Sequence, residues 1–312
     1  MFRGVKNGLE LIKASVSALK KYPLMLIPML LCWLLYAPIV VAAKYYIPWG
    51  SFTLPMQIAV AFALVLGLTT AFSLSAFILL ELIHQIEMGR RPALTAALRQ
   101  GLDDLFRAFP IVLIWALAWF TLSVIAAIFR KGGQHGDAQA TPENIAKTLG
   151  GGENISLAGG IIQALKKGVR MTVFIIYPAL AWEEMGTSKA VRKGLSIAKS
   201  HLSEFATGFM LTELAALVVF TPPAILFLLS DLPGVDFPDL VWFTTILYCA
   251  FAFSFTLFLE QIFTAELYLW HLILEKATED AEKAGHPTPT LATVKRPTLL
   301  DNVPDMLLTR VR

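Results

Sequence analysis

Long apolar blocks alternate with shorter polar segments along the whole chain, and the apolar blocks are long enough to cross a membrane as helices. A helix needs about 20 apolar residues to span a hydrocarbon layer of roughly 30 Å. Six segments meet or approach this length, namely 24–41, 58–80, 111–129, 163–182, 205–229 and 240–259. The pattern therefore predicts an all-α, polytopic membrane protein with six transmembrane helices.

Three further segments place apolar residues at the spacing of an amphipathic helix, and each precedes a predicted span. They centre on Gly8, Gly101 and Gly194, and consecutive glycines are 93 residues apart. In each segment apolar residues occupy offsets −3, +1, +4 and +8 from the glycine. A fixed period of this kind indicates an internal repeat. We expect such helices to lie in the membrane interface, with their cations near lipid headgroups.

The distribution of basic residues predicts the orientation. Of the 26 Lys and Arg, 19 lie in segments 1–23, 84–108, 183–203 and 271–312, and four lie in the loops on the opposite side. Because basic loops favour the cytoplasm, both termini and all three amphipathic helices are expected inside. Each unit then starts on the same side, so the repeats are parallel.

These features predict the division of the chain. A transmembrane bundle is expected over residues 1–282, with repeats at about 1–91, 92–185 and 186–282. Residues 283–312 contain several prolines and are expected to form an extended cytoplasmic tail.

Composition agrees with a membrane protein and narrows the chemistry. Apolar residues make up 56% of the 312 residues and charged residues 16%, whereas about 25% are charged in soluble domains. A net charge of +3 is too small to indicate nucleic-acid binding. The two cysteines lie far apart inside apolar blocks, which argues against a disulfide framework or a cysteine metal site.

The second predicted span carries a stripe of small residues. They recur at every fourth position: Ala59, Ala63, Gly67, Ala71 and Ser75. Such a stripe lets two helix backbones approach closely in lipid. We therefore expect this helix near the centre of the bundle, with the stripe as its packing groove.

Charged residues inside the predicted spans are the candidate functional groups. Arg170, Glu213 and Glu260 lie in or at the end of the fourth, fifth and sixth spans. An ionisable residue in the bilayer marks a functional site by default. The alternative for Arg170 is a cation that reaches headgroups or water, and Lys166 and Lys167 can extend to the outer interface in the same way. Depths estimated from the helical rise predict that Arg170 pairs with Glu213.

Carboxylates also occur at the expected cytoplasmic ends of the spans: Glu81, Glu183, Glu184 and Glu266. A metal site that combines Glu81 or Glu266 with His84, His201 or His271 is an alternative, but interfacial histidines usually serve as amphipathic ends of helices. Motifs for a catalytic nucleophile, a phosphate-binding loop or a zinc enzyme do not occur. The sequence therefore predicts no catalytic residue, no metal and no cofactor.

The stretch from Tyr177 to Leu195 resembles a known family. It reads Tyr-Pro-Ala-Leu-Ala-Trp-Glu-Glu-Met-Gly and, three residues later, Ala-Val-Arg-Lys-Gly-Leu. This is similar to the signature of a family of uncharacterised six-helix bacterial integral membrane proteins, in which a V-P-V-L-x-x-E-x-x-G stretch precedes an A-L-x-x-S helix. The membrane domain of bacterial glycerophosphodiester phosphodiesterases has a broadly similar pattern.

The resemblance implies a six-helix fold in the bacterial inner (plasma) membrane. This chain departs from the family pattern at Gly194, where serine is usual, at Glu266, where an apolar residue is usual, and in its longer C-terminal tail. The family has no settled activity, so the resemblance bears on fold more than on function.

Two functions remain open. The first is a non-enzymatic scaffold or accessory subunit that handles lipid or docks partner proteins through its amphipathic helices or tail. The second is a transporter for a small or amphipathic substrate that uses Arg170, Glu213 and Glu260 along its pathway. A cavity lined by these charges favours transport, and a solid core with an apolar groove favours the scaffold. Membrane lipid is the expected partner, nucleic acid is not, and homo-oligomerisation stays open.

Overall fold

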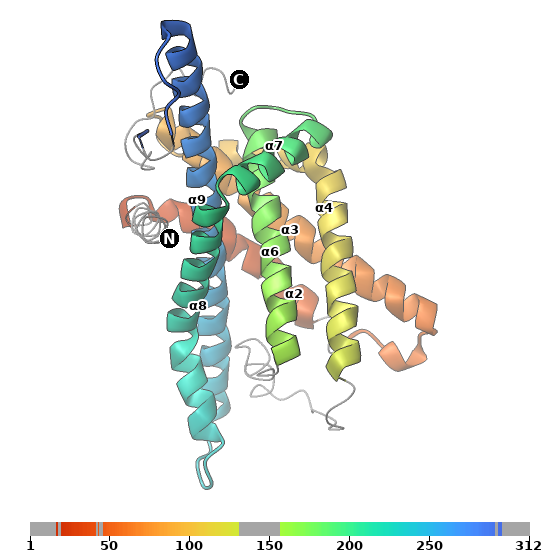
Figure 1. The fold of residues 1–312 in the computed structure, drawn as a ribbon. Coiled ribbons are helices and arrows are strands. Elements are labelled where there is room, and N and C mark those ends of the chain that lie inside the picture. The colour runs from red at the N-terminus through yellow and green to blue at the C-terminus, as the bar shows by residue number, and fades with distance from the viewer. Residues whose placement is uncertain are drawn as a thin grey trace.

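The computed structural model describes residues 20–41, 46–130 and 157–290, together with 17, 43, 293 and 294. The described residues form seven α-helices and no strand, which confirms the all-α class (Figure 1). The helices are α2 (Ile27–Val41), α3 (Leu54–Glu87), α4 (Leu94–Arg130), α6 (Leu157–Ala181), α7 (Thr187–Ser200), α8 (Leu202–Ser230) and α9 (Asp239–Ala284). Short 3-10 helices, η1 (Pro23–Leu26) and η3 (Trp49–Ser51), precede α2 and α3.

Four of these helices are long and apolar enough to cross a membrane, namely α3, α4, α8 and α9. The chain is therefore compatible with a multi-pass membrane protein. Of the remaining predicted spans, 24–41 is divided between η1 and α2, and 163–182 lies in α6 except for Trp182. They do not meet the same criterion, because α2 has only 15 residues and α6 carries three cations.

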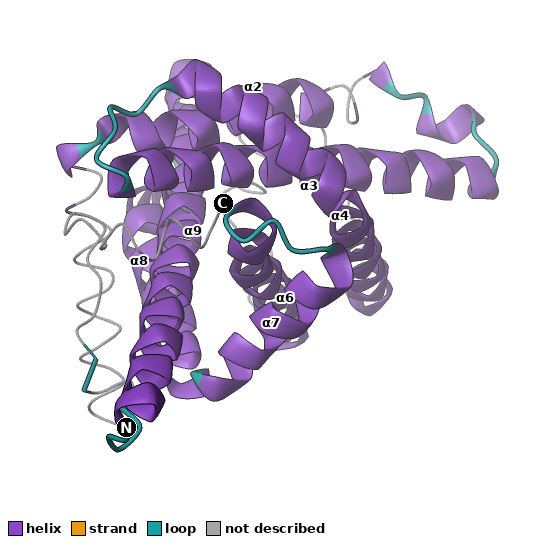
Figure 2. Ribbon diagram, turned by 90° about the horizontal axis from the view of Figure 1, so that it is seen from above, coloured by secondary structure: helices purple, strands orange, loops and turns teal. Residues whose placement is uncertain are grey.

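In Figure 1, α4, α6 and the α8–α9 hairpin run side by side, and α7 crosses one end of them. Viewed from above in Figure 2, α2 and α3 lie on one side of the bundle, with α6 and α7 on the other. The helix α6 packs against α3, α4, α7 and α9, whereas α8 packs mainly on α9. This places α6 at the centre of the described bundle.

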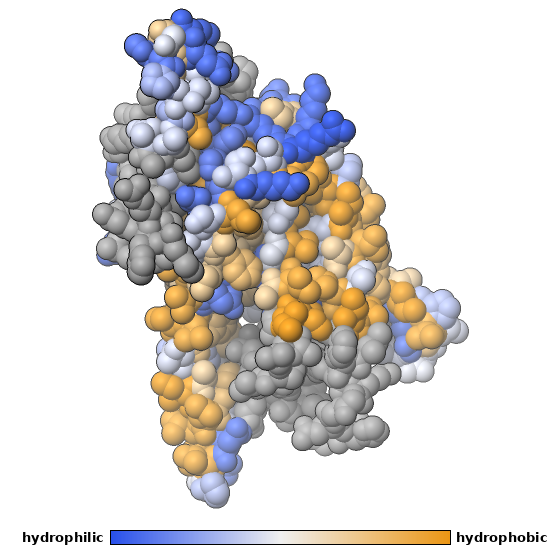
Figure 3. All heavy atoms as spheres, viewed as in Figure 1, coloured by the Kyte–Doolittle hydropathy of each residue, from blue (hydrophilic) through white to orange (hydrophobic). Residues whose placement is uncertain are grey.

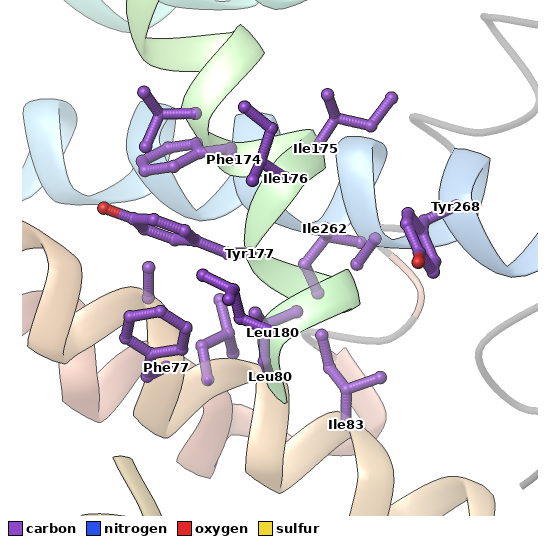
Figure 4. Close-up of a cluster of buried hydrophobic side chains, with 14 of the residues drawn as sticks. Phe77, Leu80, Ile83, Phe174, Ile175, Ile176, Tyr177, Leu180, Ile262 and Tyr268 are labelled. Atoms are coloured by element: carbon purple, nitrogen blue, oxygen red, sulfur yellow. The ribbon is translucent and has the colours of Figure 1, made fainter. Parts of the chain in front are cut away.

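The core lies where α6 meets α3 and α9 (Figure 4). Tyr177 of α6 is fully buried, with its ring centroid 4.4 Å from that of Phe77 on α3. Its hydroxyl lies 2.6 Å from the Ser73 hydroxyl. Every residue of α9 from 256 to 270 is buried, as expected for a helix surrounded by others.

The small-residue stripe of α3 is only partly a packing groove. Ser75 is buried and donates to the sulfur of Met29 on α2 at 3.4 Å. In contrast, Ala59, Ala63 and Gly67 are exposed. Apart from its two chain neighbours and the adjacent backbone of α3 itself, no described atom lies within 4 Å of the place a Cβ would take at Gly67.

The predicted continuous groove is therefore wrong for residues 59–67 of α3. Spacing identifies residues that share one face of a helix but not how far a neighbouring helix extends along it. Here α3 has 34 residues while α2, which packs along it, has 15.

The helix α8 continues through Pro222 and Pro223, although neither residue has an N–H for the helical ladder. The missing bond at Pro223 leaves the carbonyl of Val219 without its usual donor. The hydroxyl of Tyr248 on α9 donates to that carbonyl at 2.9 Å. A side chain from the neighbouring helix thus stabilises the proline pair inside the helix.

The predicted amphipathic helices are described in part. Residues 2–22 fall almost entirely outside the described residues, the second helix forms the start of α4, and the third is α7. Gly101 and Gly194 take corresponding places in the last two. A Cβ at Gly101 would stand 3.1 Å from the backbone nitrogen of Ile78 on α3, and one at Gly194 would stand 3.0 Å from Cα of Ile176 on α6.

An alanine extends each of these close contacts into a seam, that is, a strip of small buried residues along which the two helices touch. Ala97 and Ala190 lie four residues before the two glycines, and both are fully buried. In each case, then, a helix of the bundle is followed by an amphipathic helix that packs back on it through an alanine and a glycine.

The helix α9 ends at a glycine. Gly285 adopts a left-handed conformation with φ of 68°, which ends the helix at Ala284. Most of the predicted tail beyond this point lies outside the described residues.

Candidate functional site

Four charged side chains meet between α6, α8 and α9. Arg170 of α6 donates from Nε and Nη2 to the two carboxylate oxygens of Glu260 on α9, both at 2.7 Å. The exposed fractions of these side chains are 10% and 0%. One turn earlier on α6, Lys167 lies 2.6 Å from Glu213 of α8 and 3.7 Å from Glu260. Two cations therefore meet two carboxylates, and the paired guanidinium bonds fix the geometry.

The predicted Arg170–Glu213 pair is therefore wrong in its partners, although all three candidate charges lie in one cluster. Arg170 reaches Glu260 because α9 packs directly on α6. Glu213 lies on α8, which packs mainly on α9, and only the long side chain of Lys167 bridges the gap. Lys167 is buried and points into the bundle, so the expectation that it reaches the headgroups is also wrong.

A second polar cluster ties together the ends of α6, α7 and α9. Glu183, which follows α6, accepts a hydrogen bond from the Tyr268 hydroxyl of α9 and another from Lys193 of α7 at 2.9 Å. Lys193 also donates to Glu275 of α9 at 3.1 Å. Burial opposes protonation of Lys193, but its bonds to the two carboxylates outweigh burial and raise its pKa above the ordinary value.

His271 extends this cluster to the junction of α7 and α8. Its Nε2 lies 3.3 Å from Glu275, and its Nδ1 lies 2.9 Å from Nε2 of His201. If His271 donates to Glu275, its Nδ1 accepts from His201, an arrangement that suits two neutral rings. Burial lowers the pKa of His201, the neighbouring His271 lowers it further, and Glu204 acts weakly in the opposite direction.

The four predicted carboxylates are dispersed over the same end of the bundle. Only Glu183 belongs to the cluster just described. Glu184 is exposed and lies 3.9 Å from Arg107 of α4, Glu81 accepts a hydrogen bond from Gln85 at 3.2 Å, and Glu266 is fully buried on α9. They do not build one shared site.

The helix α7 has three distinct faces. The face packed on α6 holds Ala190, Gly194 and Ile197. The predicted apolar positions of α7 lie beside this face, where Leu195 is 39% exposed and Val191 and Ala198 are partly buried. The fourth predicted position, Leu202, falls in α8. The third face carries exposed cations, namely Lys189, Arg192 and Lys199. Figure 3 shows hydrophilic residues gathered around α7 and apolar residues below it, over α4 and α6.

The start of α4 repeats this arrangement. Beside its Ala97–Gly101 seam, Leu98, Leu102 and Phe109 are exposed by 43%, 39% and 43%. The turn between α3 and α4 adds a polar pocket of about 600 Å³. Its lining includes three arginines, Arg90, Arg91 and Arg99.

A mostly apolar cavity of about 370 Å³ opens between α2, α3, α4, α6 and α9. Aromatic side chains form much of its wall: Trp33, Tyr36, Phe72, Trp119 and Phe253. Gln163 and Thr69 add polar groups, and no described Lys, Arg, Asp or Glu lines it. The charged cluster around Arg170 is therefore not part of the cavity wall.

The sequence did not show which of these charged and aromatic side chains would meet. It held one clue to the charged cluster, because Lys167 and Arg170 are three residues apart and therefore share a face of α6. The cavity left no comparable signal, because its walls come from five helices that are distant in sequence.

A scan of protein-family models, a search of curated proteins and a search of solved structures each returned no match.

Proposed function

We propose that this chain is a non-enzymatic scaffold of the bacterial inner membrane that handles lipid at the cytoplasmic face. The observation that carries the proposal is the division of α7 into a buried alanine–glycine seam, an apolar face on which Leu195 is exposed, and a basic face. A helix of this kind lies in the interface, with its apolar face among acyl chains and its cations near anionic headgroups. Together, α7 and the start of α4 form a collar around the inner ends of the spans.

The proposal includes six spans in three parallel repeats, with both termini cytoplasmic. Two of the three cations on α6 are paired with carboxylates of neighbouring helices, which reduces the cost of placing α6 in the bilayer. The corresponding places of Gly101 and Gly194 support the repeat. The resemblance of residues 177–195 to six-helix bacterial membrane proteins agrees with this count.

The geometry favours a scaffold over a transporter. Arg170 and Glu260 face each other and are almost fully buried, so they lock α6 to α9. The cavity has no charged lining among the described residues. A cavity lined by the intramembrane charges would favour transport. Because these charges do not line the cavity described here, the arrangement does not support a transporter.

Site-specific fluorescence tests the collar. Leu195→Cys and Ser196→Cys place an environment-sensitive fluorophore at neighbouring exposed positions of α7; Cys32 and Cys249, both buried, are replaced by alanine. In vesicles of phosphatidylcholine and phosphatidylglycerol, we expect a blue shift at position 195 and quenching by lipids that carry a nitroxide in the acyl chain. The probe at 196 should report water. Equal, water-like spectra at both positions would contradict the proposal.

A further inference from the structure

We infer that the cavity between α2, α3, α4, α6 and α9 binds one long-chain fatty acid, with the chain along the aromatic wall and the carboxylate at Lys166. The inference rests on the proposed lipid-handling function and deepens it by naming a ligand class and a site.

The cavity wall suits a hydrocarbon chain. Ring centroids of Trp33 and Tyr36 lie 5.0 Å apart, those of Tyr36 and Phe72 5.9 Å, and those of Phe72 and Phe253 5.8 Å. These rings make one continuous apolar surface contributed by α2, α3 and α9. A volume of about 370 Å³ is at the low end for small-molecule sites, which range over about 300–1,000 Å³. It therefore suits one chain better than the two chains of a phospholipid.

A cation without a carboxylate partner stands beside this wall. Lys166 follows Gln163, a cavity-lining residue, by three positions on α6. Its Nζ lies 5.8 Å from the ring centroid of Trp119, which also lines the cavity. Lys167 and Arg170 on the same helix have carboxylates within ion-pair distance. Among the described residues Lys166 has none, so its charge is available to a ligand.

Because Lys166 lacks, among the described residues, the carboxylate partner that Lys167 and Arg170 have, the head group of the ligand should be an anion. A half-buried ammonium inside a span is stabilised by an anion, which can be supplied by the protein or by a ligand. The Gln163 amide can donate a further hydrogen bond to an acid. An anionic, single-chain amphiphile thus satisfies both the apolar wall and the cation at its edge.

Tryptophan quenching tests the assignment. The protein in phosphatidylcholine nanodiscs is titrated with dibromostearate, whose bromines quench the cavity tryptophans, and with its methyl ester as the uncharged match. We expect saturable quenching by the acid and much weaker binding of the ester. Lys166→Gln should weaken binding of the acid roughly tenfold or more, since a hydrogen-bonded charge is lost. Lys283→Gln removes an exposed cation near the end of α9 that belongs to neither proposed site, and it should leave binding unchanged.

A second variant tests the volume. Leu68→Phe fills part of the cavity and should reduce quenching by the acid while the protein melts near the wild-type temperature; if it fails to fold, Lys166→Gln decides. Non-saturable quenching, equal affinity of acid and ester, or wild-type affinity of Lys166→Gln would each overturn the inference. Tighter binding of a brominated lysophosphatidic acid would overturn the carboxylate assignment in favour of phosphate. A lipid-exposed probe at position 195 without acid binding would remove the cavity inference and leave the proposed function standing.

Discussion

The half of the bundle at α7, which we call the inner half, and the opposite half, which we call the outer half, differ sharply in packing. Toward α7, residues 256–270 of α9 and 173–180 of α6 are all buried. Toward the other end, Ala59, Ala63 and Gly67 are exposed, and much of α8 is exposed as well. Hydrophobicity therefore does not determine which half is packed by protein and which half is left to lipid. Whether a segment is packed by protein depends on which other helices lie beside it.

The Arg170–Glu260 pair lies at the outer edge of the close-packed half. Breaking a buried pair leaves one uncompensated charge, which costs far more than the pair contributes when intact. The polar cluster around Lys193 lies at the opposite edge, where Glu275 is 46% exposed. Changes at the first position should therefore be more costly than changes at the second.

The largest effect is expected for Glu260→Gln. The change leaves the buried guanidinium of Arg170 without its carboxylate, so the free energy of unfolding should fall by about 3–5 kcal/mol. Reversible unfolding in mixed micelles measures it. The matched comparison is Glu213→Gln, where the carboxylate is 64% exposed. A smaller loss is expected there, because Lys167 keeps Glu260 within 3.7 Å. Equal losses in the two variants would remove the distinction between buried and exposed members of the cluster.

A smaller effect is expected at the seam of α7. In Gly194→Ala the new Cβ would stand 2.6 Å from Cγ1 of Ile176, so the helices must separate slightly. Gly168→Ala on α6 meets no atom within 4 Å of the described chain and gains the same helix propensity. The difference in unfolding free energy between the two variants should be about 1–3 kcal/mol. If Gly194→Ala is as stable as Gly168→Ala, the close approach is not required.

Acidification should weaken the polar cluster at the inner edge. The pKa of His201 is lowered in the folded state, chiefly by burial, so the unfolded chain binds the proton more readily. Stability should then fall as pH drops below about 6.5, the ordinary histidine value. Thermal melts between about pH 7.5 and about pH 5.5 measure it. In His201→Asn this part of the pH dependence should disappear, and an unchanged slope would show that another group causes it.

The smallest effect is expected for Gly67→Leu in the outer half. The new side chain meets open space, so the free energy of unfolding should change by no more than about 0.5 kcal/mol. Thermal melting in nanodiscs is the measurement. A loss above about 1 kcal/mol would show that another molecule packs against the stripe, and the outer half would then be less open than the single chain indicates.

Local features of the sequence predicted local structure well. Four of the six apolar blocks each fall within one α-helix, and the glycine period identified two close contacts that the structure places in corresponding positions. Each of these follows from residues that are near one another in the chain.

Pairing between helices was predicted less well. Depth estimates placed Arg170 and Glu213 at similar heights but could not show that α9 lies between their helices. The stripe of small residues on α3, which recur at every fourth position, identified a face of the helix but not the length of the helix that packs against it. The aromatic cavity depends on five helices at once, and sequence spacing carries no information about that arrangement.

A double-mutant cycle distinguishes a buried ion pair that locks α6 to α9 from a pair of independent charges along a pathway. The free energies of unfolding of Arg170→Gln, Glu260→Gln and the double variant are compared with that of the wild type in one lipid composition. If the pair is a structural lock, the double variant loses less than the sum of the single losses, by an amount at the upper end of the roughly 0.5–3 kcal/mol found for residues in direct contact. Additive losses, with no coupling between the two positions, would show that Arg170 and Glu260 do not act as a lock.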